Sequence, residues 1–180
     1  ALYKVTDDLK FDFGLHYSTT SDFPRYDRLS TYDNDGFLRY AEWNYGPQEW
    51  LLANVQMTKL SSRSNLYDKI KLSAAYQNFK ESRISRKFNA NTRKVREENV
   101  DAFSLNFDFY KSLSSKSNFS YGTEYIYNRV GSRGRSENIT SNASEPIASR
   151  YPDGSKWQTL ATYLSHKYKP NTKLTVQSGI

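Results

Sequence analysis

The stretch from Phe103 to Tyr110 reads FSLNFDFY, and large apolar residues occupy every second position of it. Because successive side chains of a β-strand point to opposite faces of a sheet, this alternation predicts a strand with one apolar and one polar face. The same period runs from Leu9 to Tyr17 and recurs between Phe119 and Tyr127. Each run is about ten residues long, which is the length of a tilted strand that crosses a bilayer. The residues expected to face lipid are Phe11, Phe13, Leu15, Phe103, Leu105, Phe107, Phe109, Phe119, Tyr121 and Tyr125.

The connections between the expected strands alternate between short and long. Strands are expected over residues 2–5, 9–18, 50–60, 67–79, 99–111, 117–129, 157–168 and 173–180. Short turns are centred on Asp7, Ser62, Ser114 and Asn171, and long polar stretches cover residues 19–49, 80–98 and 130–156. Outer-membrane barrels have short periplasmic turns and long extracellular loops. The sequence therefore predicts an all-β fold, an antiparallel up-and-down transmembrane β-barrel segment with short periplasmic turns and long extracellular loops, in which residues 1–180 are part of one barrel domain.

Composition excludes several other classes of protein. The chain has 180 residues, a mean hydropathy of −0.84 and no run of about 20 apolar residues, so a helical membrane protein is excluded. Aromatic residues make up 16% of the chain, which suits the aromatic girdles of a barrel, although Tyr and Phe are also good strand formers. There is no cysteine, and this excludes disulfide scaffolds, Cys-bound zinc and thiol catalysis.

Two segments are ambiguous in the sequence. From Trp157 to Tyr168 apolar residues occupy both faces, so no lipid face is assigned to this strand. The stretch from Phe37 to Trp43 is either a further strand that extends above the membrane or a structured piece of loop.

Four stretches carry a resemblance to a known family. They are YSTTSDFPRYDRL at residues 17–29, AEWNYGPQEW at 41–50, AYQNFKESR at 75–83 and KYKPNTKL at 167–174. Together they resemble the barrel of TonB-dependent outer-membrane receptors of the Bacteroidetes type, and the resemblance covers nearly the whole chain. It implies a large single-chain barrel, an N-terminal plug and a short segment that engages the TonB complex.

The resemblance also implies a function. Roughly eight strands can be counted, against the 22 given for such transporters, and neither plug nor TonB-binding segment is visible, so an internal barrel segment is expected. The implied function is uptake of a scarce nutrient, such as an iron-siderophore, haem or cobalamin, across the cell outer membrane of a Gram-negative bacterium. The implied partners are outer-membrane lipid, the nutrient ligand and the TonB complex, the last through parts of the protein not in this chain. The alternative is a soluble all-β binding module without transport activity.

One group of residues is rich in both aromatic and basic side chains. The candidate ligand-binding residues are Arg25, Tyr26, Arg28, Trp43 and Tyr45, with Arg83 and Arg86 as second choices. Guanidinium groups and aromatic faces suit an anionic, conjugated or metal-chelate ligand. In the alternative interpretation the aromatic residues close the outer girdle of the barrel, and the arginines pair with Asp22, Asp27 and Glu42.

No catalytic, metal-binding or cofactor motif is found, and the chain is not expected to be an enzyme. His16 and His166 lie on distant expected strands, so they do not converge as metal ligands would. Glu97 and Glu98 are adjacent in a polar stretch, where pairing with nearby arginines is the expected role. The net charge is +7, but no basic helix or RNA-binding aromatic motif accompanies it, so no nucleic-acid partner is expected.

Overall fold

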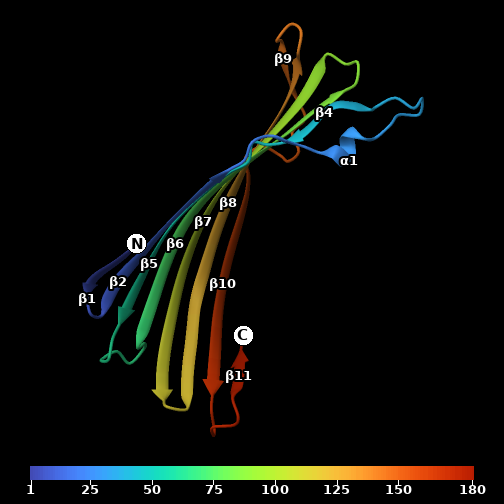
Figure 1. The fold of residues 1–180 in the computed structure, drawn as a ribbon. Coiled ribbons are helices and arrows are strands. Elements are labelled where there is room, and N and C mark those ends of the chain that lie inside the picture. Colours follow the sequence, from blue (N-terminus) through green and yellow to red (C-terminus); the bar gives the residue numbers. More distant parts are fainter.

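The computed structural model describes residues 1–180 and consists almost entirely of antiparallel β-strands (Figure 1). Eight strands form the main sheet in the order β1-β2-β5-β6-β7-β8-β10-β11. Their bounds are Leu2–Thr6, Leu9–Thr19, Glu49–Leu60, Lys69–Lys87, Thr92–Ser114, Ser117–Asn138, Ser155–Tyr168 and Val176–Gly179. Three short strands, β3 (Phe23–Pro24), β4 (Tyr40–Tyr45) and β9 (Ser144–Ile147), and one four-residue helix, α1 (Tyr26–Leu29), complete the fold. No helix is long and apolar enough to cross a membrane.

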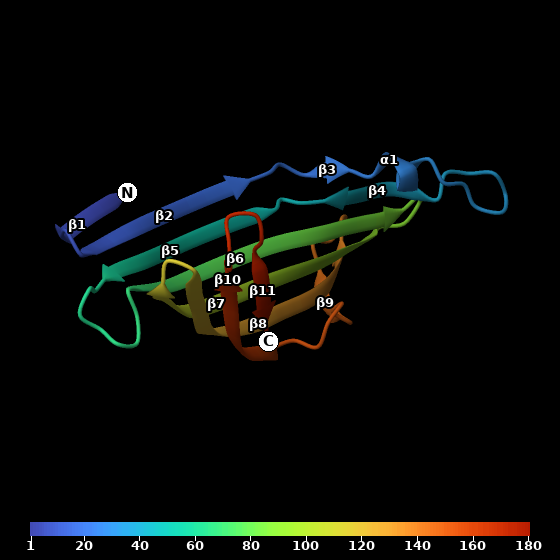
Figure 2. The ribbon, with the colours of Figure 1, turned by 90° about the horizontal axis from the view of Figure 1, so that it is seen from below.

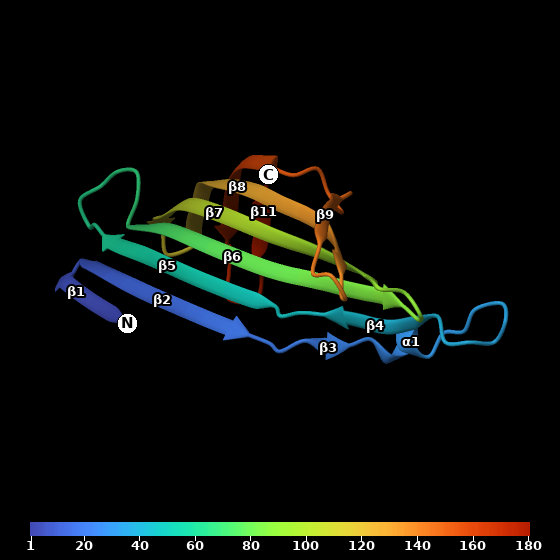
Figure 3. The ribbon, with the colours of Figure 1, turned by 90° about the horizontal axis from the view of Figure 1, so that it is seen from above.

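The sheet is curved and open. Its outermost strands, β1 and β11, do not pair with each other, and Figures 2 and 3 show them at separate edges of the curved wall. Both strands are short, so they cover only part of their neighbours. β1 pairs with β2 over residues 9–12, and β11 pairs with β10 over residues 165–168. The all-β antiparallel prediction is thus confirmed, whereas this sheet does not close into a barrel.

The prediction of two long loops was wrong, because strands run through them. β6 and β7 continue as a ladder through the expected loop 80–98, and only residues 88–91 connect them. β8 likewise continues to Asn138 inside the expected loop 130–156, where it pairs with β9. The register from Lys80↔Asn99 to Arg86↔Arg93 has no interruption. Apart from Ile84 and Val95, the residues of the β6–β7 extension are mostly polar on both faces, so the two-residue hydrophobic period that signals a strand is absent there.

Other predicted boundaries also need correction. The last strand is shorter than residues 173–180 and covers only Val176–Gly179. The expected strand 67–79 starts at Lys69 and runs on to Lys87. The ambiguous stretch 37–43 contains the start of β4 at Tyr40, and β4 pairs with the extension of β6 rather than with the main sheet's edge.

The register places the predicted apolar residues on one face. Phe13 lies opposite Val55, and the row continues through Ala74, Leu105 and Tyr125. The same row reaches Leu160 on β10, which settles the ambiguity of strand 157–168. Its even-numbered residues, including Leu164, share the apolar face. All ten residues that were expected to face lipid lie on this face by register.

We call this apolar surface the belt. Only the connection between β5 and β6 contacts it, where Tyr67 lies against Phe109 and the Leu66 carbonyl accepts a hydrogen bond from Tyr121. The belt comprises Leu9, Phe11, Phe13, Leu15, Ala53, Val55, Met57, Ile70, Leu72, Ala74, Tyr76, Phe103, Leu105, Phe107, Phe109, Phe119, Tyr121, Tyr125, Tyr127, Leu160 and Leu164. Leu15 is 78% exposed and Leu160 69% exposed, and the whole chain has only six buried residues. Val95 is the only hydrophobic side chain among them. The sheet therefore has no core of the kind that stabilises a soluble domain.

The belt has a defined height. On β7 it begins after Asp101 and ends before Lys111, and Asp101 lies in a polar row with Asn78 and Arg129. These ten residue steps correspond to about 34 Å of strand at ~3.4 Å per residue. At the strand tilt of about 40° that is usual in outer-membrane barrels, this length corresponds to a height of about 26 Å, and the apolar band of such barrels is ~25 Å tall.

Tyr163 covers a glycine on the polar face. Tyr163 and Gly122 are directly opposed in the β10–β8 register, and a Cβ at residue 122 would lie 2.7 Å from the Tyr163 ring and 2.3 Å from the Phe107 carbonyl oxygen. The Tyr163 hydroxyl donates a 2.7 Å hydrogen bond to Asp108. Only glycine leaves room for this ring, which joins β10 to β7 across β8.

Candidate functional site

The sheet continues beyond the belt as a smaller polar sheet, seen at the top of Figure 1. We call it the distal sheet: it consists of β3, β4, β9 and residues 81–87 of β6, 92–98 of β7 and 132–138 of β8. Its edge strands β3 and β9 are short and contain Pro24 and Pro146. Short, proline-containing edge strands resist pairing with further strands, so β3 and β9 terminate the distal sheet at its two edges.

A cluster of two arginines and two aromatic residues lies on one face of the distal sheet. Tyr45 is directly opposite Arg83, and the Arg83 guanidinium carbon lies 4.9 Å from the centre of the Tyr45 ring. Arg25 follows β3, and its guanidinium carbon lies 4.9 Å from the Trp43 ring and 5.4 Å from the Tyr45 ring. Arg25 also donates a 2.9 Å hydrogen bond from Nη1 to the Tyr45 hydroxyl. We call these four residues the Arg–aromatic cluster.

The cluster lies on the polar face of the sheet. Odd-numbered residues of β6 occupy the face opposite the belt, and Arg83 is one of them. Asp27 accepts hydrogen bonds from Arg25, which raises the pKa of the guanidinium and lowers the pKa of the Asp27 carboxyl. Both groups are therefore charged at neutral pH. The pair fixes the direction of Arg25, and a planar guanidinium so held can bind an anion in a defined geometry.

A buried carboxylate lies beside the cluster. Glu98 is only 4% exposed and is directly opposite Glu81 on β6 and Ser132 on β8. Arg150, which follows β9, approaches both carboxylates, at 2.9 Å from Glu81 and 3.5 Å from Glu98. Burial raises the pKa of the Glu98 carboxyl, because desolvation disfavours its charged form.

Two buried polar atoms of this region have no hydrogen-bond partner, namely Nε of Arg83 and Oε2 of Glu98. An unsatisfied buried group costs about 1–3 kcal/mol. The Arg83 guanidinium stacks on the Tyr45 ring and has Glu81 3.6 Å from its Nη2, and an acceptor for its Nε–H would remove this cost. The arrangement therefore suits a ligand that carries a negative charge and a flat or delocalised group.

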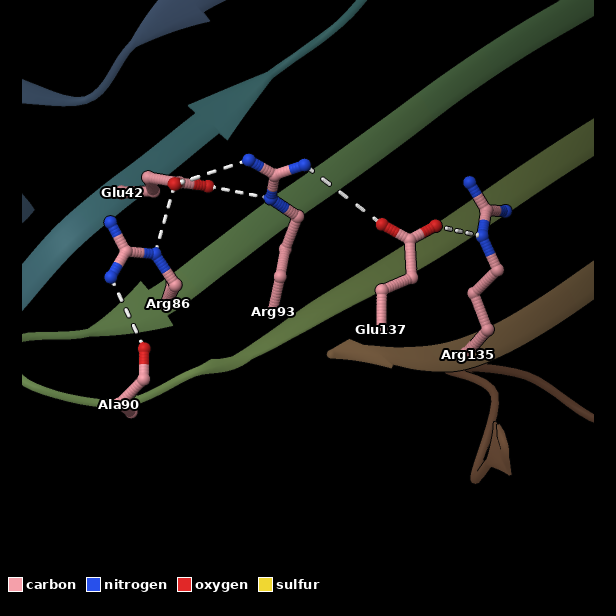
Figure 4. A network of polar contacts seen from close by, with 6 residues as sticks. All are labelled: Glu42, Arg86, Ala90, Arg93, Arg135 and Glu137. Carbon is pink, nitrogen blue, oxygen red and sulfur yellow. Dashed lines mark hydrogen bonds and ion pairs between the residues drawn. The ribbon is translucent and has the colours of Figure 1, made fainter. Parts of the chain in front are cut away.

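A second polar network lies on the opposite face of the distal sheet (Figure 4). Glu42 accepts hydrogen bonds from Nε of Arg86 at 2.9 Å and from Nε of Arg93 at 2.7 Å. Arg93 continues to Glu137 at 4.0 Å, and Glu137 accepts a 2.6 Å hydrogen bond from Arg135. The hydrogen bond from Arg93 and then that from Arg86 lower the pKa of Glu42. This network joins β4, β6, β7 and β8, and the buried Val95 lies on the same face, opposite Ile84 on β6 and Arg135 on β8.

The structure separates the predicted ligand-binding residues into two groups. Arg25, Trp43, Tyr45 and Arg83 come together in the Arg–aromatic cluster. Tyr26 and Arg28 lie outside it on α1, where Tyr26 is 75% exposed. Arg86 lies on the other face and pairs with Glu42. The alternative interpretation, in which the arginines pair with carboxylates, holds for Arg28, which lies 4.0 Å from Asp27. Arg25 both pairs with Asp27 and stacks on aromatic rings.

Sequence reasoning missed the part that Arg150 and Ser132 play near the cluster. Arg150 is 69 residues from Glu81 in the chain, and no local pattern relates them. The structure gathers no three His, Cys, Asp or Glu side chains that could hold a metal ion.

No family model, curated protein or solved structure matches this chain. The geometry of the belt and of the Arg–aromatic cluster therefore carries the functional argument.

Proposed function

We propose that this chain forms part of the wall of an outer-membrane β-barrel receptor that takes up a scarce nutrient. The observation that carries the proposal is the belt, which is continuous across six strands in register and is exposed except where the β5–β6 connection contacts Phe109 and Tyr121. An exposed apolar surface of this size is unfavourable in water and favourable in lipid. Its height of about 26 Å matches the hydrocarbon thickness that an outer-membrane barrel spans.

The open edges support a barrel with more strands. β10 is unpaired on its outer side over residues 155–163, and β2 is unpaired on its outer side over most of residues 14–19. Unpaired backbone groups at the depth of the belt would be costly in lipid. Further strands of the same receptor pair with these edges and close the wall, and the plug and the TonB-engaging segment belong to other parts of that protein.

The Arg–aromatic cluster is the ligand contact in this proposal. The face opposite the belt lines the lumen, and the cluster lies on that face, beyond the level of the belt. A ligand that approaches from outside the cell meets Arg25 and Arg83 before it enters the barrel. The two guanidiniums bind its anionic groups, and Trp43 and Tyr45 contact its flat surface. Ferric siderophores, haem and cobalamin are the ligands to test.

The test compares two neighbouring arginines in the full-length protein. Arg25→Ala removes a guanidinium from the cluster, and Arg28→Ala is the matched control, because Arg28 lies three residues away and outside the cluster. Ligand affinity is measured by quenching of tryptophan fluorescence against a ferric catecholate, haem and cobalamin. We expect Arg25→Ala and Arg83→Ala to weaken binding of one of these ligands more than about tenfold, roughly 1.4 kcal/mol.

The control must bind like the unaltered protein, and each variant must keep its folded, heat-resistant form in detergent. Equal affinity for all three variants and the unaltered protein would remove the cluster from the ligand site. A full-length protein that stays soluble and monomeric without detergent, yet binds its ligand through Arg25, would instead favour a soluble all-β binding module.

A further inference from the structure

Three basic side chains lie together at the border between the belt and the distal sheet. Arg129 follows Tyr127 by two residues on β8, so it is on the belt face and one row beyond the aromatic edge of the belt. Lys156 on β10 is directly opposite Arg129, and Arg133 is on the same face further along β8. All three are exposed.

None of the three has an anionic partner in this chain. The acidic side chains with ion-pair partners make those pairs with other cations, and no hydrogen bond joins any of the three to a protein group. Arg129 and Lys156 are like charges in directly opposed positions, which is destabilising on a sheet. The arrangement is therefore incomplete without an external anion.

The carboxylates opposite them in register are already engaged. Asp101, opposite Arg129, accepts hydrogen bonds from Tyr76 at 2.7 Å and from Asn78 at 2.8 Å. Glu97, opposite Arg133, accepts a 2.6 Å hydrogen bond from Arg135.

A polar groove of about 560 Å³ begins at this border. Arg129 and Arg133 line one side of it, and no hydrophobic residue lines it. Six carboxylates also line the groove, and each already has a partner in this chain. Glu49 pairs with Lys80, Glu81 and Glu98 with Arg150, and Glu97 with Arg135, while Asp101 and Asp153 accept hydrogen bonds from Tyr76 and from the Ser132 backbone N–H. The groove thus offers room for a polar group directly beyond the end of the belt.

We infer that Arg129, Arg133 and Lys156 bind the phosphate of an anionic lipid headgroup in the leaflet next to the distal sheet. The inference rests on the proposed membrane location, since the belt sets the depth of these residues. A lipid whose chains cover the belt places its headgroup at the row of Arg129 and Lys156. Guanidinium groups bind phosphate with paired hydrogen bonds, and lysine adds a point charge.

The experiment measures lipid selectivity of the full-length protein in vesicles. The anionic headgroup is supplied by phosphatidylglycerol, which makes up about 20 mol% of vesicles that otherwise consist of phosphatidylcholine. The protein is extracted with its surrounding lipid into polymer-bounded discs, and the ratio of the two lipids is compared with that of the vesicle. A triple variant, Arg129→Gln, Arg133→Gln and Lys156→Gln, is compared with a charge-matched control, Arg28→Gln, Lys87→Gln and Lys94→Gln.

We expect the unaltered protein and the control to enrich phosphatidylglycerol at least about threefold, and the triple variant to lose that enrichment. Equal lipid ratios for the triple variant and the control would overturn the inference. So would full competition by millimolar inorganic phosphate, because the site would then belong to a soluble anion.

Failure of this inference can be told apart from failure of the proposed function. Insertion into the membrane is measured separately, by the change in electrophoretic mobility between heated and unheated samples and by protection of the barrel from protease. Inserted protein without any phosphatidylglycerol enrichment would overturn the headgroup site alone. Protein that does not insert into either kind of vesicle would overturn both proposals.

Discussion

Replacing Leu105 by arginine should destabilise the protein in a membrane far more than the same change at the adjacent Ser104. Leu105 lies on the belt and Ser104 on the opposite face, at nearly the same depth on β7. The centre of the belt on this strand falls at Asn106, midway between Asp101 and Lys111. Leu105 is thus one residue from the centre, or about 3 Å along the membrane normal.

The expected magnitude follows from this depth. Arginine on the lipid face of a barrel costs about 2–4 kcal/mol at the midplane. Leu105→Arg should therefore lower the folding equilibrium constant about 30- to 700-fold, given a factor of ten for every ~1.4 kcal/mol. Ser104→Arg faces the polar side, where its neighbours in register are Ala75 and Ile126 and no hydrogen bond of its side chain is lost. We expect it to change stability by less than about 0.5–1 kcal/mol.

The assay is unfolding of the full-length protein from lipid vesicles by guanidinium chloride, followed by tryptophan fluorescence. Vesicles of two hydrocarbon thicknesses separate membrane effects from general effects of arginine on the sheet. Equal losses at the two positions would refute the assignment of the belt to lipid, and a larger loss for Ser104→Arg would reverse the two faces.

Two further predictions concern other parts of the sheet. Gly122→Ala should destabilise the protein by about 1–3 kcal/mol, because the new Cβ would lie 2.3 Å from the Phe107 carbonyl oxygen. The control is Gly131→Ala on the same strand, whose Cβ would have no neighbour closer than 3.7 Å and which should change stability by less than about 0.5 kcal/mol. Thermal unfolding in detergent measures both variants, and equal losses would count against the Tyr163–Gly122 arrangement. Glu42→Gln should cost about 1–2 kcal/mol at neutral pH, since two arginines lose a charged acceptor. The pKa of Glu42 is lowered from its ordinary 4.5, so its stabilisation is full above a pH of about 4.5 and is lost as the pH falls through the folded-state value. The protection factors of the β4 amides, which correct for the intrinsic pH dependence of exchange, should fall over that range in the unaltered protein and stay constant in Glu42→Gln. The same fall in both proteins would show that another group controls it.

The sequence predicted those parts of the fold where the two faces differ in polarity. From Phe103 to Phe109 every second residue is apolar, and this fixed both the strand and its face. The turn at Ser114 was equally clear, because a polar break separates two such runs. The remaining face assignments needed the strand register of the structure. The strand 157–168 has apolar residues on both faces, and only the pairing of Leu160 with Tyr125 shows which of them belongs to the belt.

The distal sheet could not be predicted in this way. Residues 80–98 are polar on both faces, so they read as a loop although the β6–β7 ladder runs through most of them. Cross-strand ion pairs such as Arg86–Glu42 take the place of hydrophobic packing, and charge pairing leaves no periodic signal. The density of arginine and aromatic residues did point to Arg25, Trp43 and Tyr45. It could not show that Arg28 lies outside the cluster, nor that Arg150 reaches Glu81.

The most direct test of the central claim is the accessibility of successive residues of β7 in a membrane. These 180 residues contain no cysteine, so once any cysteine elsewhere in the full-length protein is replaced, single cysteines can be introduced from Phe103 to Asp108 and labelled with a nitroxide. Collisions with oxygen, which concentrates in lipid, are compared with collisions with a water-soluble nickel chelate. Our account predicts a period of two, with oxygen favoured at Phe103, Leu105 and Phe107, and the nickel chelate favoured at Ser104, Asn106 and Asp108. Low accessibility of Leu105 to both reagents would place it in a protein core and contradict the membrane-facing belt.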